Sequence, residues 1–195
     1  MTHLSSHFQA YMSRMKLIKR WGLMRSTNEE NDMEHTLQVT MIAHMLCEIR
    51  RVRYHGEVDL EKVMGYALYH EVAEVITGDL ASPIKYFNPQ IKDAFKEIEK
   101  LAAEKLIGYL PEDLRESYAP LLLPNEQSIE WKLVKAADKI AAYLKCIEET
   151  GQGNAEFDQA ASKLRLEINK LSLPEVQDFM KESAPSFALS LDGLN

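Results

Sequence analysis

Residues 60–79, LEKVMGYALYHEVAEVITGD, constrain the fold of this chain more than any other stretch. The first half repeats apolar residues on one face of a helix, at about 100° per residue. In the second half the same face continues with His70, Glu71 and Glu74. Burying an imidazole and two carboxylates is unfavourable unless partners neutralise them. We therefore predict a helix that carries a polar site toward the protein interior and that is broken by residues 78–83.

Apolar residues recur at helical spacing along most of the remaining sequence as well. Helices are predicted over residues 8–21, 35–49, 60–77, 91–106, 111–120, 129–147, 156–171 and 174–182. No segment alternates polar and apolar residues as a strand does, and neither a repeat nor a linker is evident. We predict an all-α architecture in which residues 1–195 form a single domain.

The charge and composition exclude several classes of function. A net charge of -7 argues against non-specific binding to nucleic acid or to a membrane surface, because either would need a basic face. No apolar run reaches about 18 residues and no secretory leader pattern is present, so we expect neither membrane spanning nor secretion. Cys47 and Cys146 stand singly in helical patterns, which predicts reduced core thiols in a cytoplasmic protein.

Two further polar side chains fall on inward helix faces. His35 faces inward on the helix predicted around it, whereas His44 falls on the opposite side. A lone inward histidine is more often a hydrogen-bonded core residue than a metal ligand. Asp138 lies within an apolar helix, where an aspartate is rare unless it is paired. Together with His70 and Glu71, these residues make a set of two imidazoles and two carboxylates that suits a divalent transition metal.

Several segments around these residues resemble one family. They are residues 14–21 (RMKLIKRW), 34–39 (EHTLQV), 69–74 (YHEVAE), 77–80 (TGDL), 83–88 (PIKYFN), 142–146 (AYLKC) and 185–187 (PSF). The chain resembles the HD-domain phosphohydrolases, whose signature is a first His, an adjacent His-Asp pair and a distant Asp. It is most similar to the bacterial 5'-deoxynucleotidases of the YfbR type, over nearly its whole length. The resemblance implies an HD-domain helical bundle.

The resemblance also implies a metal site. His35, His70 and Asp138 match the metal ligands of the family, and Glu71 stands where the family has the Asp of its His-Asp pair. Glu74 matches the acid that handles the protons of the attacking water or of the leaving oxygen. The expected cofactor is one divalent transition metal: cobalt, manganese, zinc, nickel, iron or copper.

The substrate implied is a deoxyribonucleoside 5'-monophosphate, hydrolysed to a deoxyribonucleoside and phosphate by a cytoplasmic homodimer. The residues expected to contact it are Arg20, Trp21, His35, Asp79, Leu80, Ala81, Ser82 and Asp138. Arg20 would align the phosphate in catalysis, because a guanidinium donates two parallel hydrogen bonds. Trp21 would pack on the nucleoside, although the residue pattern alone favours a core position for it. Asp79 and its loop to Ser82 would read the sugar.

Glu71 is the departure from the family pattern, and it leaves alternatives open. Glutamate offers the same ligand atoms one methylene further out, so we expect metal binding to be retained and hydrolysis to be weakened. A weakly active or non-catalytic nucleotide-binding HD-domain protein is the alternative. Residues 70–74, HEVAE, also look like the H-E-x-x-H helix of zinc proteases. That scheme lacks its second histidine and gives no role to His35 or Asp138, so we give it little weight.

Overall fold

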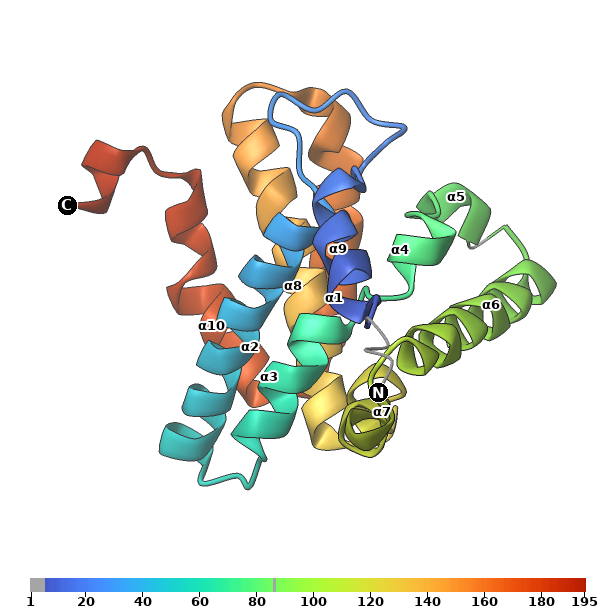
Figure 1. The fold of residues 1–195 in the computed structure, drawn as a ribbon. Helices are drawn as coiled ribbons and strands as arrows, with labels where there is room; N and C mark the ends of the chain where they lie inside the picture. Colours follow the sequence, from blue (N-terminus) through green and yellow to red (C-terminus); the bar gives the residue numbers. More distant parts are fainter. Residues whose placement is uncertain (1–5, 86) are drawn as a thin grey trace.

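The computed structural model describes residues 6–85 and 87–195, with only the backbone of Ser82, and it confirms the all-α prediction (Figure 1). Within these ranges there is no β-strand, and the single isolated bridge pairs Lys19 with Asn31 in antiparallel fashion. None of the helices described combines the length and the apolarity needed to cross a bilayer. That residues 1–195 form one domain stays a prediction.

The helices follow one another along the chain with short connections. The α-helices are α1 (Phe8–Met12), α2 (Asp32–Tyr54), α3 (Leu60–Tyr69), α4 (Glu74–Thr77), α5 (Ser82–Lys85), α6 (Pro89–Gly108), α7 (Arg115–Leu122), α8 (Ile129–Gly151), α9 (Asp158–Asn169) and α10 (Pro174–Glu182). The 3-10 helices are η1 (Ser13–Leu17), η2 (Glu112–Leu114), η3 (Ala155–Phe157), η4 (Ala184–Ala188) and η5 (Leu191–Leu194).

The two long helices α2 and α8 form the centre of the bundle, and α3, α9 and α10 pack around them (Figure 1). Their facing sides supply fully buried residues such as Val39, Val63 and Ile140, whose removal from water drives the packing. Each long helix begins at a side-chain cap. Asn31 and Glu34 form a capping box at the start of α2, and Ser128 caps α8. The caps fix the residue at which each of the two helices begins.

A second apolar cluster lies beside the first. Phe8 of α1, Leu106 of α6 and Leu122 of α7 are buried in it together with Val72. The segments α4 to α6 extend to one side of the bundle (Figure 1). This arrangement leaves the α3–α4 junction between the two clusters, where the polar residues of the predicted site lie.

The helix predicted over residues 8–21 is wrong beyond Leu17. η1 ends there, and Ile18 takes an extended backbone conformation. The Arg20 N–H donates to the carbonyl of Glu30 at 2.9 Å, and the Asp32 N–H donates to the carbonyl of Ile18 at 3.1 Å. These partners are distant in sequence, so helix propensity is overridden by pairing with the chain just before α2.

The continuous helix predicted over residues 60–77 is also wrong. α3 ends at Tyr69, and α4 is displaced from its axis (Figure 1). His70 Nδ1 donates to the carbonyl of Ala67 at 2.8 Å, which is the acceptor that the Glu71 N–H would use in a continuous α-helix. The next turn closes instead by a bond from the Glu74 N–H to the Glu71 carbonyl at 3.0 Å. The break therefore sits at the predicted metal ligands themselves.

The other predicted helices are present with shifted ends. The largest shift is at α2, which is predicted to end at residue 49 and continues to Tyr54. At residues 111–120, η2 precedes α7, and α7 continues past Pro120 to Leu122. α10 has the predicted bounds, Pro174–Glu182. Cys47 and Cys146 are buried free thiols, as expected.

Candidate functional site

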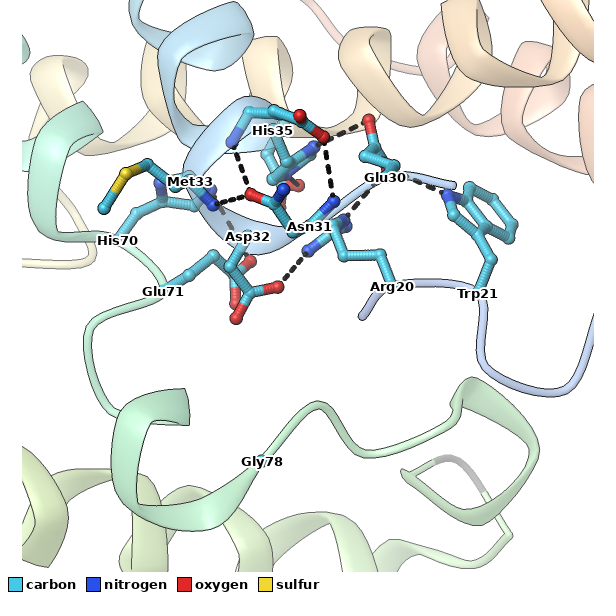
Figure 2. A network of polar contacts seen from close by, with 12 residues as sticks. Arg20, Trp21, Glu30, Asn31, Asp32, Met33, His35, His70, Glu71 and Gly78 are labelled. Carbon is cyan, nitrogen blue, oxygen red and sulfur yellow. Dashed lines mark hydrogen bonds and ion pairs between the residues drawn. The ribbon is translucent and has the colours of Figure 1, made fainter. Parts of the chain in front are cut away.

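Four polar side chains from three segments converge next to the start of α2, and Figure 2 shows three of them, His35, His70 and Glu71. His35 comes from the first turn of α2, His70 and Glu71 follow α3, and Asp138 lies in α8. Their candidate ligand atoms all lie within 4.8 Å of one another. His35 Nε2 is 3.1 Å from Asp138 Oδ1, and His70 Nε2 is 3.5 Å from Glu71 Oε1. The predicted convergence is confirmed, and His44 is exposed on the outer face of α2 as expected.

His70 offers a nitrogen suited to a metal. Because a carbonyl cannot donate, the bond to Ala67 places a proton on Nδ1, and in the neutral ring Nε2 then carries a lone pair. Burial lowers the pKa of His70 to about 4, against the opposing attraction of Glu71 and Asp138, so the ring is neutral near pH 7. Nε2 is buried and has no hydrogen-bond partner among the described residues. A divalent ion would satisfy it.

The two carboxylates supply the negative charge that a divalent ion requires. Burial opposes the ionisation of Asp138, but Lys135, with which it forms an ion pair, and His35 hold its pKa well below the usual range. Burial likewise opposes the ionisation of Glu71, but a hydrogen bond with Glu74 and the nearby His70 lower its pKa to about 2. Both are therefore ionised near pH 7, and the residues present fit a divalent metal.

Glu74 differs from its neighbours because it retains a proton. Its side chain is buried at the start of α4, and this burial together with the adjacent Glu71 carboxylate raises the pKa of Glu74 to about 12. Its Oε2 atom has no partner among the described residues. A protonated carboxyl beside the cluster can donate a proton to a reacting group.

Arg20 lies between two carboxylates at the edge of the cluster (Figure 2). Its Nε atom is 3.3 Å from Glu30 Oε2, and its Nη1 atom is 3.7 Å from Asp32 Oδ1. Burial alone would lower the pKa of Arg20, but Glu71, Asp138 and other nearby acids raise it above its ordinary value. The guanidinium therefore stays charged in a largely buried position.

Trp21 follows Arg20 and shares one of its partners. Its Nε1 atom donates to Glu30 Oε2 at 3.1 Å, and its ring lies against Phe157 at 5.3 Å between centroids. The side chain is half-buried, so a core position, which the residue pattern alone favours, is wrong. Trp21 has a backbone φ of 58°, in the left-handed region that is unfavourable for a bulky residue. Such a conformation persists only where the surroundings hold it.

The loop predicted to read the sugar begins at Asp79, directly after Gly78, and Figure 2 shows Gly78 on a different segment from Arg20. Burial and Glu71 raise the pKa of Asp79 while Arg20 lowers it, so its carboxyl lies within electrostatic reach of the cluster. Leu80 and Ala81 are half-buried, and the side chain of Ser82 lies outside the described structure. No direct contact links Asp79 to Arg20 or Trp21 among the described interactions.

A cavity of about 670 Å³ adjoins the cluster on the α6 side. The residues that line it include His70, Glu71, Glu74, Lys85 and Lys135. Its lining does not include Arg20, Trp21 or Asp79. The cavity therefore adjoins the metal ligands but is not lined by these three predicted substrate residues.

Comparison with known proteins identifies the family. The model of the YfbR-like 5'-deoxynucleotidases matches residues 7–187. The chain belongs to this family. The 5'-deoxynucleotidase of Erwinia tasmaniensis is 47% identical to it over 193 residues, covering 98% of each chain. The 5'-deoxynucleotidase YfbR of Escherichia coli (strain ATCC 8739) is 47% identical over 191 residues, covering 97% of this chain and 96% of that protein.

Solved structures show the same fold at lower sequence identity. An HD-domain phosphohydrolase of Listeria innocua superposes with a TM-score of 0.83 at 23% identity, covering 95% of this chain and 90% of the other. The cyanophage S-2L HD phosphohydrolase DatZ, bound to dA and one catalytic Zn2+ ion, has a TM-score of 0.64 at 21% identity, with 92% and 95% covered. These structures confirm the HD-type bundle.

Membership in the YfbR-like family makes the chain a 5'-deoxynucleotidase, that is, a phosphomonoester hydrolase. HD-domain enzymes of this kind depend on a metal, and His35, His70, Glu71 and Asp138 form the group of described residues that could hold a divalent ion. The zinc-protease alternative, which needs residues 70–74 on one helix, is also wrong, because these residues do not form one helix.

The sequence reasoning missed three residues of this YfbR-like site. Glu30 and Asp32 lie outside every predicted helix and outside the segments that carry the family resemblance, yet both contact Arg20, and Glu30 Oε1 also lies 4.0 Å from His35 Nδ1. Nothing local in the sequence indicates these contacts. Lys135, by contrast, precedes Asp138 by three residues, a spacing that places both on one helix face and could have been noticed.

Proposed function

We propose that the enzyme hydrolyses deoxyribonucleoside 5'-monophosphates with one divalent ion held by His35, His70, Glu71 and Asp138. The observation that carries the proposal is the convergence of these four side chains, with a lone pair of His70 left buried and unpartnered among the described residues. A bound divalent ion lowers the pKa of a coordinated water and polarises a phosphoryl oxygen. The donor set suits cobalt, manganese, zinc, nickel, iron or copper.

Arg20 is proposed to orient the phosphate. Two of its atoms face Glu30 and Asp32 at 3.3 and 3.7 Å, and a guanidinium has five N–H donors, so donors remain for phosphate oxygens. Its charge is held in a buried setting, where it interacts strongly with the charge that develops during reaction. His35 and Asp138 are proposed to border the same phosphate.

Glu74 is proposed to hold the proton that the leaving 5'-oxygen receives. Support comes from its raised pKa, which keeps the carboxyl protonated near pH 7, and from its place next to Glu71. No side chain needs to act as the nucleophile in this scheme. Glu74 would therefore act as a general acid.

The sugar and base are proposed to lie between Trp21 and the loop that begins at Asp79. Asp79 would accept a hydrogen bond from the sugar hydroxyl, and Leu80, Ala81 and Ser82 would form the wall that disfavours a 2'-hydroxyl. Stacking on Trp21 accepts the face of any base, so we expect loose base selection.

Glu71 is proposed to ligate the metal with some loss of rate. Its carboxylate lies within the cluster, 3.5 Å from His70 Nε2, which supports ligation. The extra methylene displaces the ligand oxygen relative to an aspartate, and a misplacement of about 1 Å can cost about a hundredfold in rate.

We also propose that the enzyme is a homodimer. The outer face of α2 carries Met33, Leu37, Met41 and Met45, one turn apart from one another. These side chains are 41%, 59%, 58% and 43% exposed, which makes a continuous apolar stripe. Such stripes commonly mark protein contacts. Light scattering should give the mass of two chains, and Met41→Glu should shift it to one.

The proposed setting is the cytoplasm, with a small nucleotide as partner and neither a nucleic acid polymer nor a membrane. The buried thiols of Cys47 and Cys146 are free, which suits a reducing compartment. The net charge of -7 opposes binding to polyanions.

A phosphate-release screen tests the proposed function. The purified protein is offered ribo- and deoxyribonucleoside monophosphates with each candidate metal in turn. We expect release from deoxyribonucleoside 5'-monophosphates and little from ribonucleotides. Stoichiometric metal and nucleotide binding without any phosphate release would instead favour a non-catalytic nucleotide-binding protein.

A further inference from the structure

We propose that Glu149, paired with Lys145, is a positioning residue. It holds the segment of residues 20–31 against α8 and thereby positions Arg20 and Trp21, the proposed substrate-binding residues. This inference rests on the proposed function, because it assumes that Arg20 and Trp21 face the substrate. It concerns side chains far along α8 from the metal ligands.

The carboxylate of Glu149 is fully buried and is surrounded by donors. It accepts hydrogen bonds from the Thr27 N–H at 2.8 Å, the Thr27 hydroxyl at 2.6 Å and the Asn28 N–H at 3.1 Å. Asn154 Nδ2 donates to it at 2.8 Å, and Lys145 Nζ at 2.6 Å. Lys145 Nζ also donates to the carbonyl of Asn28 at 2.5 Å. One buried ion pair thus binds both the N–H groups and a carbonyl of the segment.

The segment of residues 20–31 is closed at its base and fastened at its tip. The base is the bond from the Arg20 N–H to the Glu30 carbonyl, at 2.9 Å. The tip is the contact of Thr27 and Asn28 with Glu149. Next to the tip, Arg25 Nε donates to Glu156 at 2.7 Å, and the Arg25 carbonyl accepts a hydrogen bond from Asn154 Nδ2 at 2.7 Å. Of these contacts, only those of Thr27 and Asn28 are made to α8 itself, through the buried Glu149 and Lys145.

The helix that carries Glu149 and Lys145 also carries a predicted metal ligand. The anchor formed by these two residues is therefore linked to the metal cluster through α8. Asp138 and Glu149 are separated by 11 residues, or roughly 16 Å along an α-helix. α8 therefore carries Asp138 at the metal cluster and, further along, the tip of the segment whose base bears Arg20. Because one helix carries both, the tip of the segment is held at a fixed position relative to the metal cluster, and Arg20 at its base is positioned with it.

The backbone of Trp21 shows that the segment needs to be held. Its φ of 58° is in the left-handed region, which a tryptophan adopts only under constraint from its surroundings. Burial opposes ionisation of Glu149, but Lys145 and Thr27 hold its pKa well below the usual range, so the anchor is charged near pH 7. A purely structural role is the competing interpretation, because a buried ion pair also stabilises the fold.

Activity measurements with a matched control separate the two interpretations. Glu149→Gln should lower kcat/KM for a deoxyribonucleoside 5'-monophosphate about tenfold or more, because small misplacements of an aligning group are costly. Glu148→Gln removes the same charge from the neighbouring residue, which makes no hydrogen bond to the segment, and should leave kcat/KM unchanged. Metal content should match wild type in both variants.

A double-mutant cycle tests whether the effect passes through Arg20. In an Arg20→Ala background, Glu149→Gln should lower kcat/KM by less than about threefold, because coupled residues are non-additive. The same tenfold loss in that background would overturn the proposal. Since removing one partner of a buried pair can unfold a protein, Thr27→Val serves as the milder variant. It removes one hydroxyl donor and should lower kcat/KM by about threefold.

A spectroscopic readout is independent of catalysis. The chain has two tryptophans, so Trp131→Phe leaves Trp21 as the only one. In that background Thr27→Val and Glu149→Gln should increase acrylamide quenching of Trp21 and the hydrogen exchange of residues 20–31. Unchanged quenching and exchange would contradict the anchor. If the wild type releases no phosphate, the proposed function fails, and quenching and exchange then decide the anchor by themselves.

Discussion

Two segments face each other across the site, and they are held in different ways. Residues 18–31 pair with the start of α2, form ion pairs through Arg20 and are tied to α8 through Glu149. In residues 77–85 the described hydrogen bonds are local, such as Gly78 N–H to the Glu74 carbonyl at 2.8 Å. The exception is Lys85, which forms an ion pair with Glu99 of α6 at 2.8 Å.

The difference matches the demands of the two halves of the proposed substrate. A phosphate whose charge changes during reaction is stabilised best by groups that are already in place. Arg20 meets this condition, since its surroundings are set before any ligand arrives. The sugar and the variable base only have to fit into the site, so the loop that contains Asp79 can be less constrained. We expect substitutions on the phosphate side to have the larger effects.

The largest effect is expected from removing a predicted metal ligand of the site between the two segments. His70→Ala should abolish stoichiometric metal binding and phosphate release, because it removes a buried neutral imidazole from the cluster. His44→Ala, on the exposed face of α2, should leave both unchanged. Metal analysis of the purified variants measures how much metal each one binds. Metal loss in His44→Ala with retention in His70→Ala would contradict the assignment of the site.

Arg20→Ala tests the constrained side directly. We expect kcat to fall about a hundredfold, as for the loss of one preorganised donor, with a smaller rise in KM. Lys19→Ala is the control, since Lys19 is an exposed cation one residue away that pairs with Glu29. Steady-state kinetics on one deoxyribonucleoside 5'-monophosphate provide both constants. A rise in KM with kcat unchanged would mean that Arg20 binds the substrate without aligning it.

Glu71→Asp tests the ligand position at the proposed metal site, between the two segments. Shortening the side chain should bring kcat up by about tenfold with little change in KM, because the aspartate restores the ligand position of the family pattern. Metal affinity should be nearly the same, since aspartate and glutamate offer the same oxygen ligands. If the aspartate variant is slower than wild type, the site has adapted to glutamate and the proposal of a handicap is wrong.

The smallest effect is expected on the less constrained side. Asp79→Ala should reduce the preference for deoxyribonucleotides over ribonucleotides by about tenfold, which corresponds to the loss of one hydrogen bond to a charged group. The rate on the preferred substrate should change less than in Arg20→Ala. Asp93→Ala, on the exposed surface of α6, is the matched control. Equal turnover of both sugars by the wild type would remove the sugar-reading role from Asp79.

Much of the fold was determined by local features of the sequence. α2 and α8 follow from apolar spacing and from their capping residues, Asn31 and Ser128. The same spacing placed His35 and Asp138 inward, and both lie in the cluster. These features could be predicted because periodicity and capping depend on residues a few positions apart.

Only the tertiary structure decided where helices were interrupted at the site. Residues 60–77 have helical spacing throughout, yet the His70 ring takes the Ala67 carbonyl and ends α3. The pattern in residues 8–21 likewise predicts a helix, yet Ile18 is extended because it pairs with Asp32. In both places a bond to a side chain or to a distant backbone group replaces the local i to i−4 bond.

The partners of Arg20 also depended on the tertiary structure. Glu30 and Asp32 are ten and twelve residues from it in sequence, and neither position shows a pattern that marks a contact. Glu149 lies further still from the segment that it holds. Electrostatic pairing acts through space and depends on which groups are buried together, so a one-dimensional pattern of residues does not contain it. The sequence therefore determined the metal-competent residues, and the packing of the segment of residues 20–31 against α8 decided how Arg20 is held beside them.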